Sequence, residues 1–416
     1  MRKKYLFLLE CFPLPDHEDW VQKNYHIVKK FINKDNNISI IIFNKGVSSR
    51  NLKDDREKFI KIFSNKIHFK ILDVTQQKQN LLINIFRLLS PRAIDHFKIK
   101  ENVIISTKNF IKLCNPKKII SFGNVANAVL NNIKLKNTKK IFITAGVPDQ
   151  FVKSDLVDNI ESNPLMFFPS IIKYFFLQKE MFFIKKLASD YDTLICSDKL
   201  GASYFKKVCN KIIVVNNAVN DWLPKRYKND IKNIKRNKNI LFILSGNTTP
   251  NRNATKNFIK FIYPHLKKNY FKSNKINQIR IVGAKSQLTK KIEDLKFNKI
   301  NCLGWVKDIS KEFCNNRLLI VANDSLMHTR TRIAHSFSCG MPVLTHIANT
   351  IYDKPLKKDY NIFVAKNFEE FNKQIDNVFN NKIDLLKISK NARNTFLHKY
   401  HINNMVEKVY NSIKNT

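Results

Sequence analysis

Short apolar runs alternate with longer stretches of helical pattern along almost the whole chain. Runs of four to seven residues that are apolar throughout are typical of strands buried on both faces, as in parallel sheets. The runs cover 5–9, 38–43, 67–72, 119–122, 141–144, 193–196 and 212–215 in the first half, and 240–245, 279–282, 317–322, 342–345 and 361–364 in the second. Helical stretches between them favour right-handed strand–helix–strand units. The pattern therefore predicts an α/β protein with parallel sheets.

A polar stretch divides the two series of runs. A chain of 416 residues exceeds what one hydrophobic core usually supports. Residues 223–239 are highly charged and contain no long apolar run. We therefore predict one doubly wound domain over 1–222, a linker over 223–239, a second doubly wound domain over 240–394 and a C-terminal helix over 395–416.

Glycine is scarce, with eight residues in the chain against a typical share of about 7%. Gly246, Gly283, Gly304 and Gly340 border strand-like runs of the second half. Ligands bind outside the carboxyl ends of open parallel sheets, where a glycine lets backbone amides approach a phosphate or a ring. Ordinary turn chemistry explains any one of them, but the set points to a ligand site at that edge.

The formal net charge of +41 first suggests a nucleic-acid-binding protein. Most of the basic residues are lysine and they are spread over the whole chain. Base and bidentate phosphate recognition favour arginine. We therefore disfavour nucleic acid, and we keep two interpretations, compositional drift and attraction to anionic lipid.

The seven cysteines are widely spaced and form no CxxC pair, so they indicate neither a zinc site nor a disulfide framework. The apolar run near the start is short and no small-residue cleavage site follows it. No apolar stretch is long enough for a transmembrane helix. We expect a cytoplasmic protein, with the inner face of the cytoplasmic membrane as its alternative location.

Residues 164–187 are dense in phenylalanine and carry Lys185 and Lys186 near their end. One interpretation is an interfacial helix that touches a membrane. The other is a helix buried beneath the first sheet. The polar residues do not gather on one face, which favours the buried helix.

The second half also contains a series of ordered motifs. A turn from Gly246 to Pro250-Asn251 follows the strand-like run at 240–245, and residues 304–308 read Gly-x-Val-x-Asp. Residues 329–343 read TRTRIAHSFSCGMPV. In order and spacing these motifs resemble the C-terminal domain of retaining glycosyltransferases with the GT-B architecture, the family-4-like enzymes of glycosyltransferase group 1.

The resemblance implies two Rossmann-like domains that face each other across a cleft, with a nucleotide-sugar donor bound by the second domain. It also implies that the last helix packs back on the first domain. The first half resembles the acceptor domain more loosely, because residues 12–20 replace the usual Gly-rich loop after the first strand.

The resemblance implies a donor site formed by Gly246, Asn251, Arg252, Gly283, Trp305, Val306, Thr329, Arg330, Arg332 and His335. A sugar nucleotide carries a diphosphate whose charge grows as the glycosidic bond breaks, so cationic groups and a helix N-terminus stabilise the transition state. Arg332 is the best candidate for a charge-assisted contact, and the backbone near Trp305 cradles the base. His335 and Met327 occupy places where the family usually has glutamates.

We therefore expect a hexosyltransferase of polysaccharide biosynthesis or the cell envelope. It would use a UDP- or GDP-linked sugar and a glycan or lipid-linked acceptor. Such transfer retains configuration with the donor phosphate as base, so no catalytic residue is assigned. The second half has no Asp-x-Asp donor-site motif, and neither a metal nor another cofactor is implied. The alternatives are a catalytically degenerate binding or scaffold protein and a nucleotide-sugar epimerase of the same fold.

Overall fold

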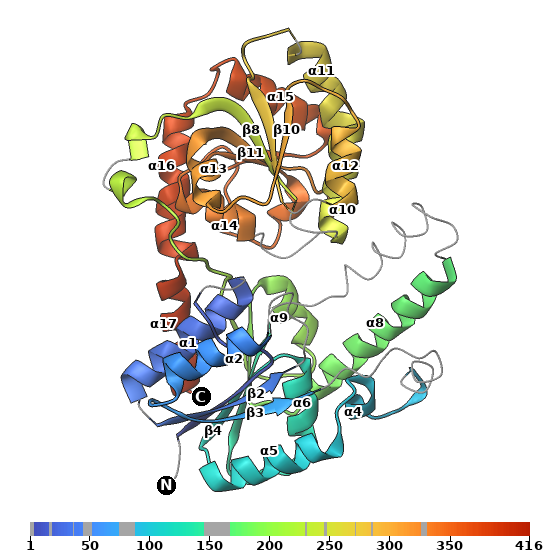
Figure 1. The fold of residues 1–416 in the computed structure, drawn as a ribbon, viewed down its shortest axis with the longest axis vertical. Helices are drawn as coiled ribbons and strands as arrows, with labels where there is room; N and C mark the ends of the chain where they lie inside the picture. The colour runs from blue at the N-terminus through green and yellow to red at the C-terminus, as the bar shows by residue number, and fades with distance from the viewer. Residues whose placement is uncertain are drawn as a thin grey trace. The chain divides into compact units, whose positions relative to one another are not determined.

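The computed structural model describes residues 4–15, 19–35, 37–44, 52–74, 88–144, 167–228, 231–244, 248–270, 272–283, 286–325 and 331–416. The chain forms two compact units (Figure 1). The first unit is Met1–Val152 with Phe168–Asn216 and Met405–Thr416, and the second is Lys153–Phe167 with Asn217–Asn404.

The first unit is built on a parallel sheet of seven strands in the order β3-β2-β1-β4-β5-β6-β7. The strands are β1 (Tyr5–Leu9), β2 (Ile38–Asn44), β3 (His68–Asp73), β4 (Lys118–Phe122), β5 (Lys139–Thr144), β6 (Thr193–Cys196) and β7 (Ile212–Val214). The direction of winding reverses between β1 and β4, so the topological switch point of this sheet lies there.

Helices pack on both faces of this sheet, which explains why β1 is apolar at every position. The helices are α1 (Asp19–Asp35), α2 (Leu52–Phe63), α4 (Ala93–His96), α5 (Glu101–Cys114), α6 (Asn124–Asn131), α8 (Phe167–Ala188), α9 (Lys199–Phe205) and α17 (Ile402–Lys414). Leu6 and Leu8 join the apolar cluster that includes α5 and α6. Tyr5 and Phe7 point to the other face, where their rings lie 4.9 and 5.1 Å from that of Phe31 in α1.

From Met405 onward the last helix belongs to the first unit. The ring of Tyr410 lies 4.8 Å from that of Phe31. The ammonium group of Lys118 donates to the carbonyls of Ile413 and Lys414, each at 2.8 Å. A cation at the carbonyl end of a helix donates to the free carbonyls there and interacts favourably with the helix dipole. Lys118 therefore fixes the end of α17 to the sheet.

The second unit has a parallel sheet of six strands in the order β10-β9-β8-β11-β12-β13. The strands are β8 (Asn237–Ile243), β9 (Gln278–Val282), β10 (Ile300–Gly304), β11 (Asn316–Val321), β12 (Val343–His346) and β13 (Phe363–Ala365). The helices are α10 (Thr249–Asn257), α11 (Tyr263–Tyr270), α12 (Gln287–Glu293), α13 (Ile309–Asn315), α14 (Thr331–Ser338), α15 (Phe368–Phe379) and α16 (Leu385–Thr395). Single π-helical turns follow α10 and α16, at Phe258–Ile262 and Phe396–Tyr400.

The predicted fold class, two doubly wound α/β domains with parallel sheets, is confirmed. Residues 223–239, for which the sequence predicts a linker, fall within the second unit, and β8 begins at Asn237. The partly buried guanidinium of Arg236 donates to the carbonyls of Phe313, Cys314 and Cys339, which ties this segment to the ends of α13 and α14.

The prediction that residues 164–187 form a buried helix is wrong for much of α8. Only the last turns of this helix, with Met181, Ile184 and Leu187, join the core. Towards its start, side chains such as Phe168 and Phe175 are exposed. Within the described residues, no helix has the length and apolar character needed to cross a membrane.

Gly283 provides a test of the fold at the edge of the second sheet. It follows β9 with a φ of 148°, and a Cβ atom built there would lie 1.8 Å from the carbonyl oxygen of Leu244. We expect Gly283→Ala to lower the free energy of unfolding by at least about 2 kcal/mol, because both backbone strain and a backbone clash oppose it. Chemical denaturation measures the loss.

Gly201→Ala is the matched control. A Cβ at Gly201 would make ordinary contacts, the nearest at 3.4 Å from Asp198 Oδ1. This variant should stay within about 1 kcal/mol of the wild type. Equal stability of the two variants would contradict the close approach at Gly283.

Candidate functional site

The carboxyl edge of the second sheet brings several of the predicted residues together. In the strand order the winding reverses between β8 and β11, which is where open α/β sheets bind ligands. The chain leaves β8 for α10 and leaves β11 for α14, so the first turns of these two helices border the switch point. Residues 248–252 and 331–335 therefore approach the same edge of the sheet.

Arg332 connects these elements across the switch point. From the first turn of α14, its Nη1 donates to the carbonyl of Ile243 at 2.7 Å and its Nη2 to Asn251 Oδ1 at 2.9 Å. Burial lowers the pKa of Arg332 to about 10, which still leaves the guanidinium protonated at neutral pH. Both partners are neutral, and no carboxylate of the described chain forms an ion pair with Arg332. The described part of the site therefore holds a partly buried positive charge with no carboxylate partner.

Arg252 follows Asn251 in sequence and donates a hydrogen bond within its own helix, α10. Its Nη2 donates to Thr249 Oγ1 at 3.0 Å. Asn251 is buried, whereas Arg252 is partly exposed. The structure thus joins Asn251 to Arg332 and places Arg252 beside them at the start of α10.

Gly283, Trp305 and Val306 lie at the ends of the neighbouring strands. The amide of Gly283 donates to the carbonyl of Gly304 at 2.9 Å, which joins the ends of β9 and β10. Trp305 is 76% exposed, directly after β10, and Val306 packs against the apolar cluster of the unit. The indole therefore presents a flat aromatic surface to solvent beside an anchored backbone.

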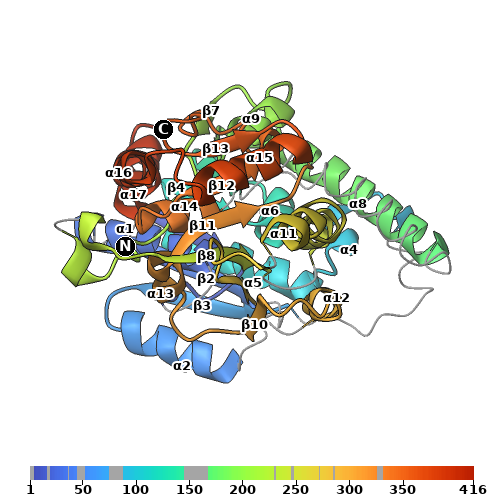
Figure 2. The ribbon, with the colours of Figure 1, turned by 90° about the horizontal axis from the view of Figure 1, so that it is seen from above.

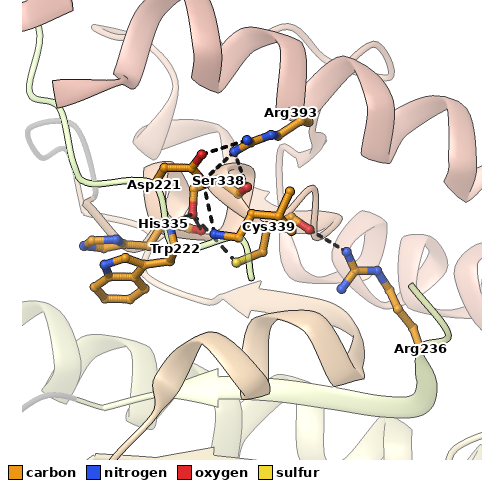
Figure 3. A network of polar contacts seen from close by, with 8 residues as sticks. Asp221, Trp222, Arg236, His335, Ser338, Cys339 and Arg393 are labelled. Carbon is orange, nitrogen blue, oxygen red and sulfur yellow. Dashed lines mark hydrogen bonds and ion pairs between the residues drawn. The ribbon is translucent and has the colours of Figure 1, made fainter. Parts of the chain in front are cut away.

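His335 follows Arg332 by three residues on α14 and is buried. The ring of Trp222 stacks on it with centroids 3.5 Å apart and planes 18° from parallel (Figure 3). Trp222 also approaches Phe313, at 5.9 Å between ring centroids. The indole therefore covers one face of the imidazole and connects α14 to α13.

Two further cations hold the C-terminal end of α14 (Figure 3). Arg393 donates to both carboxylate oxygens of Asp221, at 2.7 and 2.8 Å, and to the carbonyl of Ser338 at 2.6 Å. Arg236 donates to the carbonyl of Cys339 at 2.8 Å. Carbonyls at the end of a helix have no partner within it, so these guanidiniums satisfy them and fix the helix axis.

Sequence reasoning missed an amide network at the end of β11. Asn349 Nδ2 donates to the carbonyl of Asn323 at 2.6 Å and to Thr345 Oγ1 at 3.0 Å, and Asn253 Oδ1 accepts from the amide of Asp324 at 3.1 Å. These bonds fix the chain just before α14. Asparagine is common throughout the sequence, so no local signal distinguishes these positions.

Glu10 is a second residue that the sequence did not indicate. It follows β1 at the switch point of the first sheet, and its Oε1 accepts from the amides of Val125 and Ala126 at the start of α6, at 2.5 and 3.3 Å. Gly123, with a φ of 101°, leaves room for this carboxylate, since a Cβ there would lie 2.3 Å from the carboxyl carbon. A protein carboxylate thus fills the helix N-terminus that would otherwise attract an anion.

Three predicted site residues, Gly246, Thr329 and Arg330, lie outside the described residues, and so does Met327. In the described part of the chain, His, Cys, Asp and Glu side chains form no group of three or more that could hold a metal ion.

The Asp221–Arg393 pair gives a test of how α14 is supported. Burial would raise the pKa of Asp221, but hydrogen bonds from Arg393 and from the amide of Leu223 outweigh it and hold this pKa below its usual value. A lowered folded pKa means that the carboxylate stabilises the fold above its unfolded pKa, near 4, and loses this contribution as pH falls. We expect Asp221→Asn to lower the unfolding free energy at pH 7 by about 1.5–3 kcal/mol.

Denaturation of both proteins between pH 7 and pH 3 measures the effect. The difference between the wild type and Asp221→Asn should shrink as the pH falls through the folded pKa of Asp221. A difference that stays constant over this range would contradict the ionised pair.

No family model matches this chain, and no curated protein matches it in sequence. Its fold, in contrast, matches many solved structures. HepE of Anabaena, solved in complex with UDP, aligns with a TM-score of 0.63 and 10% identity over 99% of this chain and 100% of its own. A glycosyltransferase from Rickettsia africae aligns with a TM-score of 0.62 and 15% identity over 99% and 98%. Sucrose-phosphate synthase from Thermosynechococcus elongatus aligns with a TM-score of 0.66 and 9% identity over 99% of each chain.

These identities are low, so the matches concern the fold. The matched proteins are glycosyltransferases of GT-B architecture, and they share with this chain two Rossmann-like units on parallel sheets. This chain has the GT-B fold.

Proposed function

We propose that this protein is a nucleotide-sugar-dependent glycosyltransferase whose second unit binds the donor through Arg332. One observation carries the proposal: Arg332 is a partly buried cation at the switch point of the sheet, and its two hydrogen-bond partners among the described residues are neutral. A buried charge without a counterion is costly, and an anionic ligand removes that cost. A diphosphate is the anion that a sugar nucleotide would bring there.

The contacts of Arg332 suit the chemistry of transfer. The carbonyl of Ile243 and the amide oxygen of Asn251 take two of the five guanidinium N–H groups and fix its orientation without neutralising its charge. The remaining N–H groups can donate to phosphate oxygens. As the glycosidic bond breaks, negative charge grows on the leaving diphosphate, and a preorganised guanidinium stabilises that charge more than it stabilises the ground state.

The nucleoside would lie towards the ends of β9 and β10. Trp305 is exposed there beside the anchored backbone of Val306, so it offers an aromatic face to a base. HepE, which shares the fold, was solved with UDP, and we therefore propose a UDP-linked donor before a GDP-linked one. His335 would give the ribose a single imidazole hydrogen bond where the resembled family has a glutamate.

On the acceptor side we propose a glycan or lipid-linked glycan, at the inner face of the cytoplasmic membrane. The first unit supports a hydroxyl-rich acceptor, because Glu10 already places a carboxylate at the start of α6 and would repel a second anion. Hydroxyl groups can donate to such a carboxylate. Transfer would retain configuration, with the donor phosphate acting as base.

Arg332→Ala tests the donor site. We expect the affinity for UDP to fall about 10- to 150-fold, which corresponds to the loss of about 1.5–3 kcal/mol for hydrogen bonds to a charged group. Titration calorimetry with UDP measures it on protein shown to be folded by circular dichroism.

Arg317→Ala is the matched control, since it removes an arginine from the opposite, amino-terminal part of β11. Arg317 donates to the carbonyl of Val378 and to Asn381. Its loss should leave UDP affinity unchanged. Equal losses in both variants, or unchanged affinity in folded Arg332→Ala, would overturn the assignment. Binding of UDP without release from UDP-sugars would favour the degenerate binding protein instead.

A further inference from the structure

An apolar stripe runs along the exposed side of α8. Phe168, Phe175 and Phe182 recur every seven residues and are 75%, 53% and 61% exposed, and Ile172 lies exposed between the first two. Residues spaced by four and three lie on one face of a helix. Lys179 lies in the same stripe between Phe175 and Phe182, and Lys186 continues the spacing towards the C-terminal end. We call Phe168, Ile172, Phe175 and Phe182 the α8 face.

This face belongs to a helix that stands away from the rest of its unit. Met181, Ile184 and Leu187 anchor the C-terminal turns of α8 in the core of the first unit. From there the helix extends away from the sheet of that unit in both views (Figures 1 and 2). A helix that is apolar around much of its circumference is normally enclosed by protein or by lipid. Large exposed apolar patches mark interaction surfaces.

A neighbouring segment widens the apolar surface. The ammonium group of Lys179 donates to the carbonyl of Leu88, which brings residues 88–89 beside α8. Leu89 is itself a highly exposed apolar side chain. Burial lowers the pKa of Lys179, which fits an ammonium drawn in against the protein rather than extended into solvent.

The positive charge of α8 and of the whole chain indicates which kind of partner the α8 face would bind. Lys173, Lys185 and Lys186 belong to the same helix, and the whole chain carries a formal charge of +41. Two copies of such a chain repel each other, which opposes self-association through the α8 face. An anionic lipid bilayer can accommodate both kinds of side chain. Its apolar region accepts the phenylalanine rings, and its negative headgroups attract the lysines.

We propose that the α8 face docks this protein on an anionic phospholipid bilayer, with α8 lying in the interface. The phenylalanine rings enter the boundary between headgroups and acyl chains, and the lysine ammonium groups reach the phosphates. This docking surface is in the first unit and does not depend on the donor site proposed for the second.

Vesicle co-sedimentation of the full chain tests the proposal. The probes are vesicles of phosphatidylcholine alone and of phosphatidylcholine mixed with phosphatidylglycerol. The test variant is Phe175→Gln with Phe182→Gln, in which glutamine keeps helix propensity. We expect its partition onto the mixed vesicles to fall about tenfold relative to the wild type.

The matched control is Ile105→Gln with Leu113→Gln, which removes two apolar side chains of comparable exposure from α5 in the same unit. It should bind the mixed vesicles like the wild type. UDP affinity should be the same in all three proteins, which separates this test from that of the donor site. If the Phe175/Phe182 variant unfolds, Phe182→Gln alone gives the same comparison with a smaller change.

Three outcomes would overturn the proposal. Equal binding by the wild type and the Phe175/Phe182 variant would assign the attraction to diffuse lysine charge. Equal losses in the test and control variants would assign it to general surface hydrophobicity. If the Phe175/Phe182 variant binds vesicles like the wild type but has a lower mass in light scattering, the α8 face would be assigned to contact with a second copy of the chain.

Discussion

The placement of one partly buried guanidinium organises the second unit. Arg332 reaches from the first turn of α14 across the switch point, to the end of β8 and to Asn251 at the start of α10. The two groups that accept hydrogen bonds from Arg332 are neutral, so they orient the guanidinium without neutralising its charge. A chain with a formal charge of +41 has many cations, but no lysine in the described part of the chain is buried, and water screens exposed charges. Arg332 is partly buried, so water screens its charge less than that of an exposed lysine.

Guanidinium groups also bind the carbonyls at the C-terminal end of α14. Arg236 and Arg393 give their hydrogen bonds to carbonyls near the end of this helix, and only Arg393 has a carboxylate partner, Asp221. Trp222 covers the ring of His335 between these two ends. The helix that carries Arg332 is therefore fixed at its start, along its length and at its end. Such preorganisation allows a cation to stabilise developing charge without reorganising.

Much of the fold follows from the sequence because strands buried on both faces must be apolar throughout. The apolar runs recover twelve of the thirteen described strands within a few residues, and they miss β10, a partly buried edge strand that is not apolar throughout. Gly283 leaves no room for a side chain because of the backbone of Leu244, and its place in a ligand site stays a prediction. The stack of Trp222 on His335 could not be predicted, because it joins residues more than a hundred positions apart without a shared pattern. The exposure of Phe175 was missed because an apolar sequence looks the same whether protein or lipid surrounds it.

The most direct test of the account is thermal unfolding against UDP, GDP, ADP, CMP and a DNA oligomer at fixed salt. A ligand at a hundred times its dissociation constant adds about 2.7 kcal/mol of stability, which raises Tm by a few degrees for a chain of this size. We expect one nucleoside diphosphate, UDP, to raise Tm selectively, and we expect DNA not to raise it. No shift with any nucleotide, or a shift with DNA alone, would contradict it.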